Sequence, residues 1–493
     1  MVLVQCAVSV HRYNSNSACP IACDPNPSPH DRPAATIPQT ATVIRERFSS
    51  SFLFVLAAGC TVIGLHNFWH FPVYAAHNGG GAFVAVYALT AFVLGVPLLS
   101  AQLMIGRSAR RTPEAAVATL AAQRNATRWW GIAGAAAMLT GFALLPVTSV
   151  VGGWMLGYLP RAISGSLNGA DLQTANALFS SLAWDPERQL FWHGVFMWCL
   201  LLALGRPLHR GIELAIKIVA PVFFLLLFAE LWYSHRHGDW AQAVASIFSF
   251  DFAALGLRGF WLAVGQAFFS LGLGTAALMM YGAYLPTRAS ARAVAFWVVT
   301  MDVVVSVAGA FIVLPIVYLA GSDPGAGPSL IAQSAAVGYN TLAYGPVART
   351  LLFVLLFLVA WTSALGLAEP IVSWLEARRV GRLKSAVIVV GVAWLLGVGV
   401  ALSFNYWRFS FVFEGLLKTL GAVDIVQIAV AGIGMPLVGF LIAIFAGWVM
   451  PHEAMFAGGG RISHIGFHVW RWLLRVLVPV WCMAVLINMR LFL

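Results

Sequence analysis

Long apolar segments recur along the chain and limit the folds that it can adopt. A run of about 18 or more apolar residues can span the hydrocarbon of a membrane as a helix. Phe83–Leu99, Ile212–Trp232, Ala293–Leu319, Thr350–Leu367 and Ala386–Leu402 lie in such runs, among others. The chain is 60% hydrophobic and only 10% charged, whereas soluble chains contain about 25% charged residues. These features predict an all-α integral membrane protein.

Gly, Pro and charged residues separate the apolar segments into eleven predicted spans. Their approximate cores are 49–74, 82–106, 130–159, 190–205, 212–234, 258–285, 293–320, 346–375, 385–404, 423–450 and 467–491. We therefore expect residues 45–491 to form a single transmembrane domain. Residues 1–44 are rich in Pro, Asn, Ser and Thr and lack a sustained apolar core. We expect them to be a disordered N-terminal extension, or an upstream addition from a misassigned start codon.

Basic residues occur mainly in every second short loop, whereas the loops around Asn78, Asp171 and Asp323 are poor in Lys and Arg. This alternation is the positive-inside pattern of a multi-pass protein in a bacterial-type cytoplasmic (inner) membrane, with its N-terminus in the cytoplasm. The net charge of +11 therefore does not indicate a nucleic-acid partner, which would need basic residues clustered on one solvated face. The basic loops contain Arg107, Arg110, Arg111, Arg124 and Arg128, then Arg206 and Arg210, then Arg288 and Arg292, then Arg378, Arg379, Arg382 and Lys384.

Two spans contain polar, helix-weak residues near their middle. The first span contains Gly64-Leu-His-Asn67, and the sixth contains Ser270-Leu-Gly-Leu-Gly-Thr275. Broken backbone at membrane depth is tolerated only against protein or a water-filled cavity. The two spans are five apart, and paired interruptions in corresponding positions of two halves are typical of a transporter binding site. The alternative is that the glycines only allow close helix packing.

Several motifs resemble those of the neurotransmitter:sodium symporter family. They keep the family's order from about residue 45 to the C-terminus. The resemblance implies the leucine-transporter fold, which consists of two inverted five-helix repeats, here with one extra helix, and has broken first and sixth helices. Eleven spans fit the short bacterial branch of the family. The motifs are Asn67-Phe-Trp-His-Phe-Pro72 with Asn78-Gly-Gly-Gly-Ala-Phe83, Gly95-Val-Pro-Leu-Leu99 with Gly106-Arg107, Gly265-Gln-Ala-Phe-Phe-Ser270 with Tyr281 and Tyr284, and Thr362-Ser363 before Pro370.

The resemblance also implies two sodium sites, and sodium, as a hard cation, prefers oxygen ligands. In the second site the ligands would be the carbonyls of Cys60, Ile63 and Val359 and the hydroxyls of Thr362 and Ser363. The alternative for the two hydroxyls is hydrogen bonding to carbonyls of their own helix.

The first sodium site would use the carbonyl of Val62, the side chain of Asn67, the hydroxyl of Ser270 and a seventh-helix amide. Spacing from Gly309 and Pro315 puts Met301 at that last position, with Asp302 beside it. Either the register shifts by one and Asp302 serves, or this ligand is lost.

Asp302 is notable in itself, because an ionisable residue inside a span suggests a function. In the family's animal members a chloride binds near this region, beside residues that match Tyr87, Gln266 and Ser270. Asp302 would supply that negative charge instead. The alternative is a passive, hydrogen-bonded carboxyl in a polar crevice.

The resemblance further implies a substrate pocket, with Gly64 as its most informative residue. Monoamine carriers of the family have Asp at the position of Gly64, and amino-acid carriers have Gly. The expected substrate is therefore an amino acid or a related small zwitterion. The pocket would be lined by Val62, Gly64, Leu65, Leu144, Thr148, Phe269, Gly272, Thr275, Ser363 and Leu367.

Some positions depart from the family pattern. Thr148 replaces a tyrosine whose hydroxyl holds the substrate carboxylate, and His66 replaces a glycine. His70 stands where an arginine closes the outer gate, with Asp424 as its expected partner. At the inner gate, Arg45 and Tyr284 match, but Ala377 stands where the partner Asp belongs, and Glu376 would substitute.

The predicted function is a sodium-coupled symporter that works by alternating access, with sodium ions, a small-molecule substrate and the lipid bilayer as partners and no organic cofactor. The chain has no nucleotide-binding loop, no HExxH and no nucleophile–base motif, so we do not expect an enzyme. The alternative is a divergent homologue that no longer transports and acts as a ligand sensor or membrane scaffold. Thr148, His66, Met301 and Ala377 favour that alternative, and the sequence leaves the oligomeric state open.

Overall fold

The computed structural model describes residues 44, 46–321, 336–404, 407, 409–413, 416–456 and 464–488. All of them belong to one unit, Ala41–Leu493. The expected N-terminal extension, apart from Ile44, and the expected gate residue Arg45 lie outside the described residues. The limits of the transmembrane domain, 45–491, stay a prediction.

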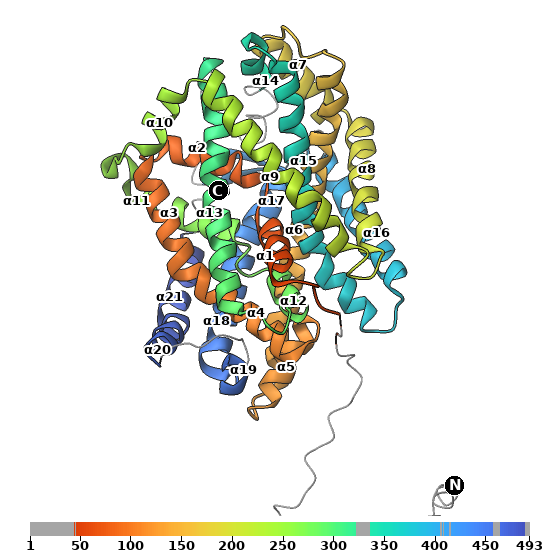
Figure 1. Cartoon of the computed structure of the whole chain (residues 1–493), viewed down its shortest axis with the longest axis vertical. Coiled ribbons are helices and arrows are strands. Elements are labelled where there is room, and N and C mark those ends of the chain that lie inside the picture. Colours follow the sequence, from red (N-terminus) through yellow and green to blue (C-terminus); the bar gives the residue numbers. More distant parts are fainter. Residues whose placement is uncertain are drawn as a thin grey trace, which may run out of the picture. The chain divides into compact units, whose positions relative to one another are not determined.

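The first half of the described chain consists of helices joined by short connections (Figure 1). Side chains of Ser50, Asp185 and Asp251 accept hydrogen bonds from first-turn amides and so fix where three of these helices begin. A π-helical turn at Ala91–Gly95 joins two helices into one continuous span, Gly81–Ala109. The helices are α1 (Ser51–Val62), α2 (His70–His77), α3 (Gly81–Thr90), α4 (Val96–Ala109), α5 (Pro113–Ala122), α6 (Gly131–Ile163), α7 (Leu172–Ala183), α8 (Pro186–Leu204), α9 (Ile212–His237), α10 (Trp240–Phe248) and α11 (Phe252–Ser270).

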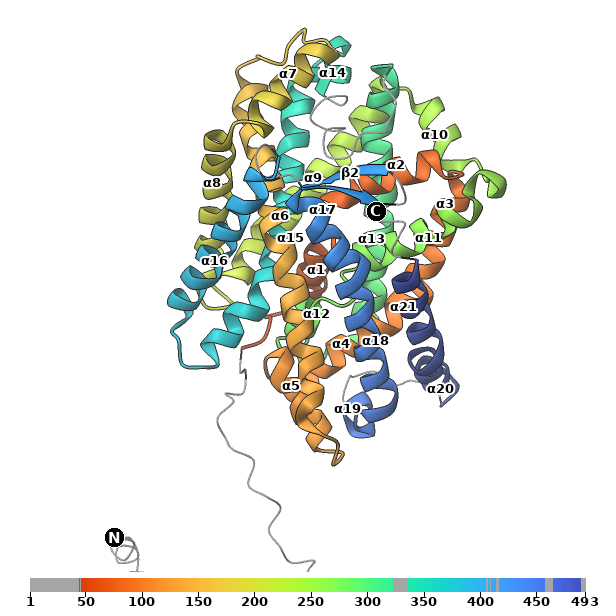
Figure 2. The same ribbon diagram turned by 180° about the vertical axis from the view of Figure 1, so that it is seen from behind.

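The second half adds more helices and one short hairpin (Figure 2). The two strands pair antiparallel, with Phe409 opposite Leu420 and Phe413 opposite Leu416. We did not predict this hairpin from the sequence. The elements are α12 (Ala277–Ala283), α13 (Ala291–Leu319), α14 (Ala336–Gly338), α15 (Gly345–Glu376), α16 (Arg382–Leu402), β1 (Phe409–Phe413), β2 (Leu416–Leu420), α17 (Ala422–Gln427), α18 (Met435–Ile444), α19 (His452–Phe456), α20 (His464–Trp472) and α21 (Val478–Ile487).

The helices agree with the predicted membrane spans. Within the described residues, 9 helices are long and apolar enough to cross a membrane, or 10 when the bent pair Ser51–Val62 and Leu65–His77 counts as one span. These ten correspond to ten of the eleven predicted spans. The remaining prediction, 190–205, falls in α8, whose 19 residues begin with the polar segment Pro186–Gln189 and are not among the ten.

Both predicted helix breaks are present. After α1 ends at Val62 the chain is extended at Gly64, and it then bends by 73° into the segment Leu65–His77. The second break separates α11 from α12, where Gly272 and Gly274 have φ angles of 59° and 99°. L side chains rarely adopt these angles, so glycine is required there. A side chain at Gly274 would also collide with the backbone of Met435.

The packing of the helices surrounds the two breaks with protein. α1 packs against α13 and α15, and α12 packs against α4. α15 also packs along α6 and α9. Figures 1 and 2 both place α1 and α12 in the middle of the other helices. The broken backbone is therefore shielded from lipid, as a broken membrane helix requires.

Candidate functional site: a pocket beside two broken helices

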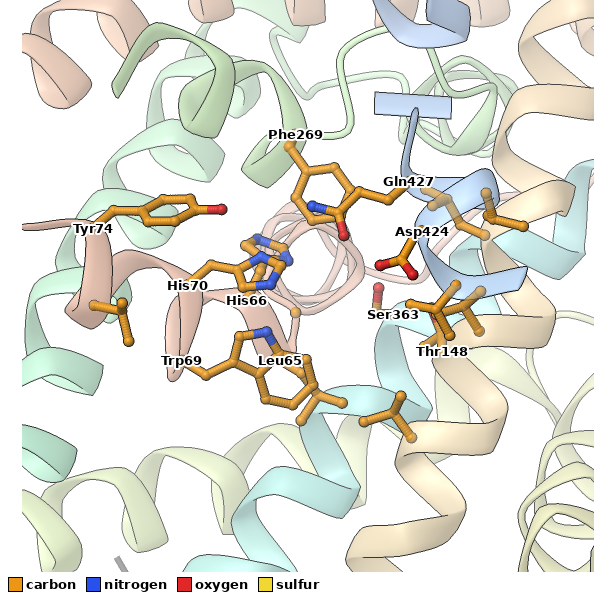
Figure 3. A pocket seen from close by; sticks show the side chains of 17 residues that line it. Leu65, His66, Trp69, His70, Tyr74, Thr148, Phe269, Ser363, Asp424 and Gln427 are labelled. Atoms are coloured by element: carbon orange, nitrogen blue, oxygen red, sulfur yellow. The ribbon is translucent and has the colours of Figure 1, made fainter. Parts of the chain in front are cut away.

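A cavity of about 410 Å³ lies beside the break of α1. Figure 3 shows Trp69, His70 and Tyr74 on one side of it, and Thr148, Ser363 and Asp424 on the other. Most of the lining is apolar or aromatic, as expected for a site that binds a small molecule. The residues that line the cavity are Gly64, Leu65, His66, Trp69, His70, Val73, Tyr74, Leu144, Val147, Thr148, Val151, Phe269, Ser363, Val423, Asp424, Val426 and Gln427.

Six of the ten predicted substrate residues line this cavity, and four do not. Thr275 and Leu367 lie together against α6 at Gly141, nearer to the N-terminal end of that helix than the cavity. The hydroxyl of Thr275 donates to the carbonyl of Gly272 at 2.9 Å. The six that line it are Gly64, Leu65, Leu144, Thr148, Phe269 and Ser363, and the four that do not are Val62, Gly272, Thr275 and Leu367.

Asn67 holds the break of α1 open. In an unbroken helix the amide of Gly64 would bond to the carbonyl of Cys60, but here it donates to Asn67 Oδ1 at 2.8 Å. The Cys60 carbonyl has therefore lost its usual helical donor. A carbonyl freed in this way is the kind of oxygen that a sodium ion needs.

A cluster of polar side chains joins the two breaks to α13. Asp302 Oδ1 accepts a hydrogen bond from Asn67 Nδ2 at 2.9 Å and from the Ser270 hydroxyl at 2.7 Å. Its Oδ2 accepts from the Tyr87 hydroxyl at 2.6 Å. Ser306, one turn further along α13, lies 2.7 Å from Asn67 Nδ2 and 3.0 Å from the Tyr87 hydroxyl. All five side chains are buried, so this carboxylate is held by hydrogen bonds away from bulk water.

The same cluster shows which of two neighbouring residues in the seventh span, Met301 or Asp302, faces Asn67 and Ser270. Asp302 faces Asn67 and Ser270, two of the predicted ligands of the first sodium site. The side chain of Met301 instead lies against Gly59 of α1, where a Cβ would be 2.5 Å from the Met301 methyl carbon. Asp302 therefore lies beside two of the predicted ligands, and its role as a sodium ligand stays a prediction. Ser306 was missed from the sequence, although its spacing of four residues from Asp302 could have revealed it.

The predicted second sodium site lies where α1 meets α15, and it stays a prediction. α1 packs against α15, and Thr61 fills the space beside Gly366. The Thr362 hydroxyl donates to carbonyls of its own helix, those of Leu358 at 3.0 Å and Val359 at 3.2 Å. Hydrogen bonding within the helix is the alternative to sodium binding that the sequence also allows for the Thr362 hydroxyl.

His66 occupies the space beside Gly64. Its ring lies over Gly64, where a Cβ would be 2.7 Å from two of the ring atoms. His66 Nε2 lies 3.0 Å from the Ser270 hydroxyl, and the ring meets Phe269 edge to face with centroids 5.1 Å apart. The Ser270 hydroxyl therefore lies between His66 and Asp302. The imidazole thus becomes part of the pocket wall.

The predicted outer gate pair lines the cavity without forming an ion pair in the described structure. His70 stacks on Tyr74 with ring centroids 5.7 Å apart. Asp424 accepts a hydrogen bond from the amide of Gly421 at 2.9 Å and points into the cavity (Figure 3). The pairing of His70 with Asp424 stays a prediction.

At the inner side, Tyr284 contacts a carboxylate that the sequence analysis did not single out, and the gate role of Glu376 stays a prediction. The Tyr284 hydroxyl donates to Glu369 Oε1 at 2.5 Å, and Arg382 binds both oxygens of Glu369 at 2.9 and 2.6 Å. Within the described residues, Glu376 joins this network through Arg382, at 3.3 Å. Glu369, not Glu376, therefore contacts Tyr284 directly. The sequence signal for Glu369 was the same as for Asp302, a carboxyl inside a span.

Within the described residues, no group of three or more His, Cys, Asp or Glu side chains is placed to hold a metal ion. The polar clusters contain mostly hydroxyl, amide and carboxylate oxygens, which suit alkali-metal ions better than zinc.

Comparisons with known proteins agree with the fold and the motifs. The model of the Sodium:neurotransmitter symporter family matches residues 45–177. An uncharacterized sodium-dependent transporter of Bacillus subtilis, YhdH, is 29% identical over 450 residues, which cover 90% of this chain and 97% of the relative. One from Haemophilus influenzae is 25% identical over 90% of this chain and 98% of the relative. The crystal structure of MhsT in complex with L-phenylalanine matches with a TM-score of 0.81 and 29% identity, over 90% of this chain and 99% of MhsT. By its motifs, its two broken helices and these similarities, the chain is similar to the sodium:neurotransmitter symporter family, and its structure has the leucine-transporter fold.

Proposed function

We propose that the protein is a sodium-coupled symporter that carries an amino acid or a related small zwitterion across the membrane by alternating access. The observation that carries this proposal is the buried cluster of Asp302, Asn67 and Ser270 beside a cavity of about 410 Å³. The cluster offers oxygen ligands and a negative charge for a cation, and the adjoining cavity has the size for a small solute. Sodium would be cargo together with the substrate, not a resident cofactor.

Coupling requires that sodium and substrate together favour one conformation over another. Ser270 belongs to the ion cluster and also contacts His66, which lines the cavity. A change at the ion cluster would therefore reach the pocket wall through one hydroxyl group. This short connection supports coupled binding of ion and solute.

The substrate assignment rests on Gly64, on the apolar walls and on similarity. MhsT, the structural relative, was solved with L-phenylalanine. No Lys or Arg side chain lines the cavity among the described residues, and its one carboxylate is Asp424. A zwitterion would bring its own positive charge to Asp424, and its negative charge would face sodium. His66 occupies part of the space beside Gly64, so the solute must also fit against an imidazole.

The positive-inside pattern supports an inner-membrane location with the N-terminus in the cytoplasm. On this orientation the Glu369–Arg382 network lies on the cytoplasmic side. The alternative, a homologue that does not transport, rests on Thr148, His66, Met301 and Ala377.

Screening amino acids, amines and betaine-like solutes for binding with and without sodium tests the proposal. We expect at least one neutral L-amino acid to bind only with sodium, and sodium-independent binding of every ligand found would contradict coupling.

Thr362→Val combined with Ser363→Ala should abolish sodium-dependent ligand binding while the protein stays folded in detergent. Both hydroxyls belong to the proposed second sodium site, and hydrogen bonds within α15 do not need the ion. The measurement is ligand binding against sodium concentration. Thr350→Val is a matched control, because the Thr350 hydroxyl also bonds within α15, to the Pro346 carbonyl at 2.8 Å. Unchanged sodium dependence in the double variant would exclude this site.

Thr148→Tyr should tighten the binding of at least one neutral L-amino acid. Thr148 lines the cavity, so a tyrosine there would bring a hydroxyl toward the solute. A hydrogen bond to a charged group typically contributes about 1.5–3 kcal/mol, or roughly ten- to a hundredfold in affinity. Thr148→Phe is the control, since it adds the ring without the hydroxyl. If folded Thr148→Tyr binds no amino acid, while wild type binds a solute that lacks a carboxylate, the amino-acid assignment is wrong.

A further inference from the structure

A second groove lies between α8, α9 and α15, away from the substrate cavity. Its volume is about 350 Å³, and Arg206, Arg210 and Gly211 of the loop between α8 and α9 line part of it. The lining is apolar except at that loop. The residues that line it are Cys199, Leu202, Ala203, Arg206, Arg210, Gly211, Leu214, Ala215, Ile218, Val219, Phe357, Leu358 and Trp361.

The apolar part of the groove faces the surroundings of the helices. Leu202, Leu214 and Ile218 are 47%, 43% and 60% exposed, although each is a large hydrophobic residue. α9 and α15 are long and apolar enough to span a membrane, so their exposed faces meet hydrocarbon. In a membrane, the acyl chains of lipids would contact this part of the groove.

The loop end of the groove is positively charged. Arg206 and Arg210 are exposed there, and the described part of the chain shows no ion pair for either guanidinium. No acidic residue lines the groove among the described residues. The nearby carboxylate of Glu213 is buried and already bonded to Ser49 at 2.5 Å and Lys217 at 2.9 Å. It therefore does not neutralise the two arginines.

An arginine binds a phosphate with two parallel hydrogen bonds and keeps its charge at any physiological pH. Basic pockets between membrane helices next to the headgroup layer are suited to acidic lipids. The groove has two arginines at the loop and an apolar surface beside the hydrocarbon of the membrane. A phospholipid would match both parts, because it carries a phosphate and a hydrocarbon chain in one molecule. A soluble anion would use the arginines only, and a neutral lipid would use the apolar wall only.

We propose that this groove is a binding site for an anionic phospholipid, with an acyl chain along α8, α9 and α15 and the phosphate on Arg206 and Arg210. The site is independent of the substrate cavity and requires only that the chain spans a membrane. The lipid would brace the start of α9 against α8 and α15. The inference goes beyond transport, because it assigns a lipid to a surface that no step of solute binding uses.

The test is lipid binding to the purified, delipidated full-length protein in detergent, titrated with dioleoylphosphatidylglycerol and followed by native mass spectrometry. Each basic side chain near a charged headgroup contributes roughly 1 kcal/mol, so Arg206→Gln with Arg210→Gln should weaken binding about 30-fold. Arg128→Gln with Arg288→Gln is the matched control, because it removes the same charge from exposed loops elsewhere and should leave binding unchanged.

Two further arms separate a lipid from a simple anion. Ala215→Trp fills the groove below the arginines and should weaken phosphatidylglycerol binding, while its thermal unfolding stays like that of wild type. Inorganic phosphate and dioleoylphosphatidylcholine should each fail to displace the bound lipid. Equal loss in the control, no loss in the double arginine variant or in Ala215→Trp, or displacement by phosphate would each overturn the proposal.

Discussion

Glu369→Gln is expected to destabilise the inner side of the protein strongly, because it removes the negative charge from a buried ion pair. Glu369 is fully buried, and Arg382, with 12% of its side chain exposed, binds both carboxylate oxygens. Removing one partner of a buried ion pair leaves the other charge without compensation and typically costs about 3–5 kcal/mol. The Tyr284 and Ser373 hydroxyls, at 2.5 and 2.8 Å from Glu369, would be left with a neutral amide oxygen as their acceptor in place of a carboxylate.

The network connects α12, α15 and α16, so its loss should also favour an inward-open arrangement. Cys60, 3% exposed on α1, is a natural reporter for this change. In a background that lacks the other cysteines, a water-soluble maleimide should label Cys60 faster in Glu369→Gln than in wild type. Thermal unfolding in detergent should show the loss of stability in parallel.

Glu376→Gln is the matched control for this prediction. Glu376 also contacts Arg382, but at 3.3 Å and with 47% of its side chain exposed. Exposed ion pairs contribute at most about 1 kcal/mol. Equal effects of the Glu369 and Glu376 changes, or no change in Cys60 labelling, would contradict the view that Glu369 holds the inner side closed.

Asp302→Asn is expected to lower the apparent affinity for sodium by roughly ten- to a hundredfold, because a contact to a charged ligand is worth about 1.5–3 kcal/mol. The carboxylate accepts from Asn67, Tyr87 and Ser270. An amide at this position would bring N–H groups toward these donors and would remove the fixed negative charge. Sodium-dependent uptake should therefore fall, or become dependent on added chloride.

Tyr87→Phe provides a graded control for Asp302→Asn. It removes one donor, at 2.6 Å, and keeps the carboxylate and its charge. We expect a smaller loss of sodium affinity and no chloride dependence. Wild-type uptake by Asp302→Asn in chloride-free buffer would show that the Asp302 carboxyl is a passive hydrogen-bonded group.

The helix breaks could be predicted from the sequence because their cause is local. Gly64 with Asn67, and Gly272 with Gly274, supply residues that weaken a helix or allow a positive φ. The fold followed from these breaks, from the apolar spans and from the family motifs. Spacing alone could not show whether Met301 or Asp302 lies beside Asn67 and Ser270, because that depends on how Met301 packs against Gly59.

Other parts of the site depend on contacts that a linear pattern does not contain. Arg382 counted only as a positive charge in an inner loop, but in the fold it turns back to Glu369 on the preceding helix. His66 could be recognised as a bulky substitution, but not as a ring that lies over Gly64 and bonds to Ser270. Four predicted pocket residues do not line the cavity. The packing of side chains sets the limits of the cavity, and this packing cannot be inferred from the positions of the family motifs.

The central claim is that a sodium gradient drives solute transport through this protein, and uptake into proteoliposomes tests it most directly. The purified full-length chain would be reconstituted, and radiolabelled solutes from the binding screen supplied outside with an inward sodium gradient. We predict accumulation above the equilibrium level that disappears when sodium is replaced by choline or when an ionophore dissipates the gradient. Binding of a solute without any gradient-driven accumulation, in vesicles shown to be sealed, would contradict the account and favour a sensor or scaffold.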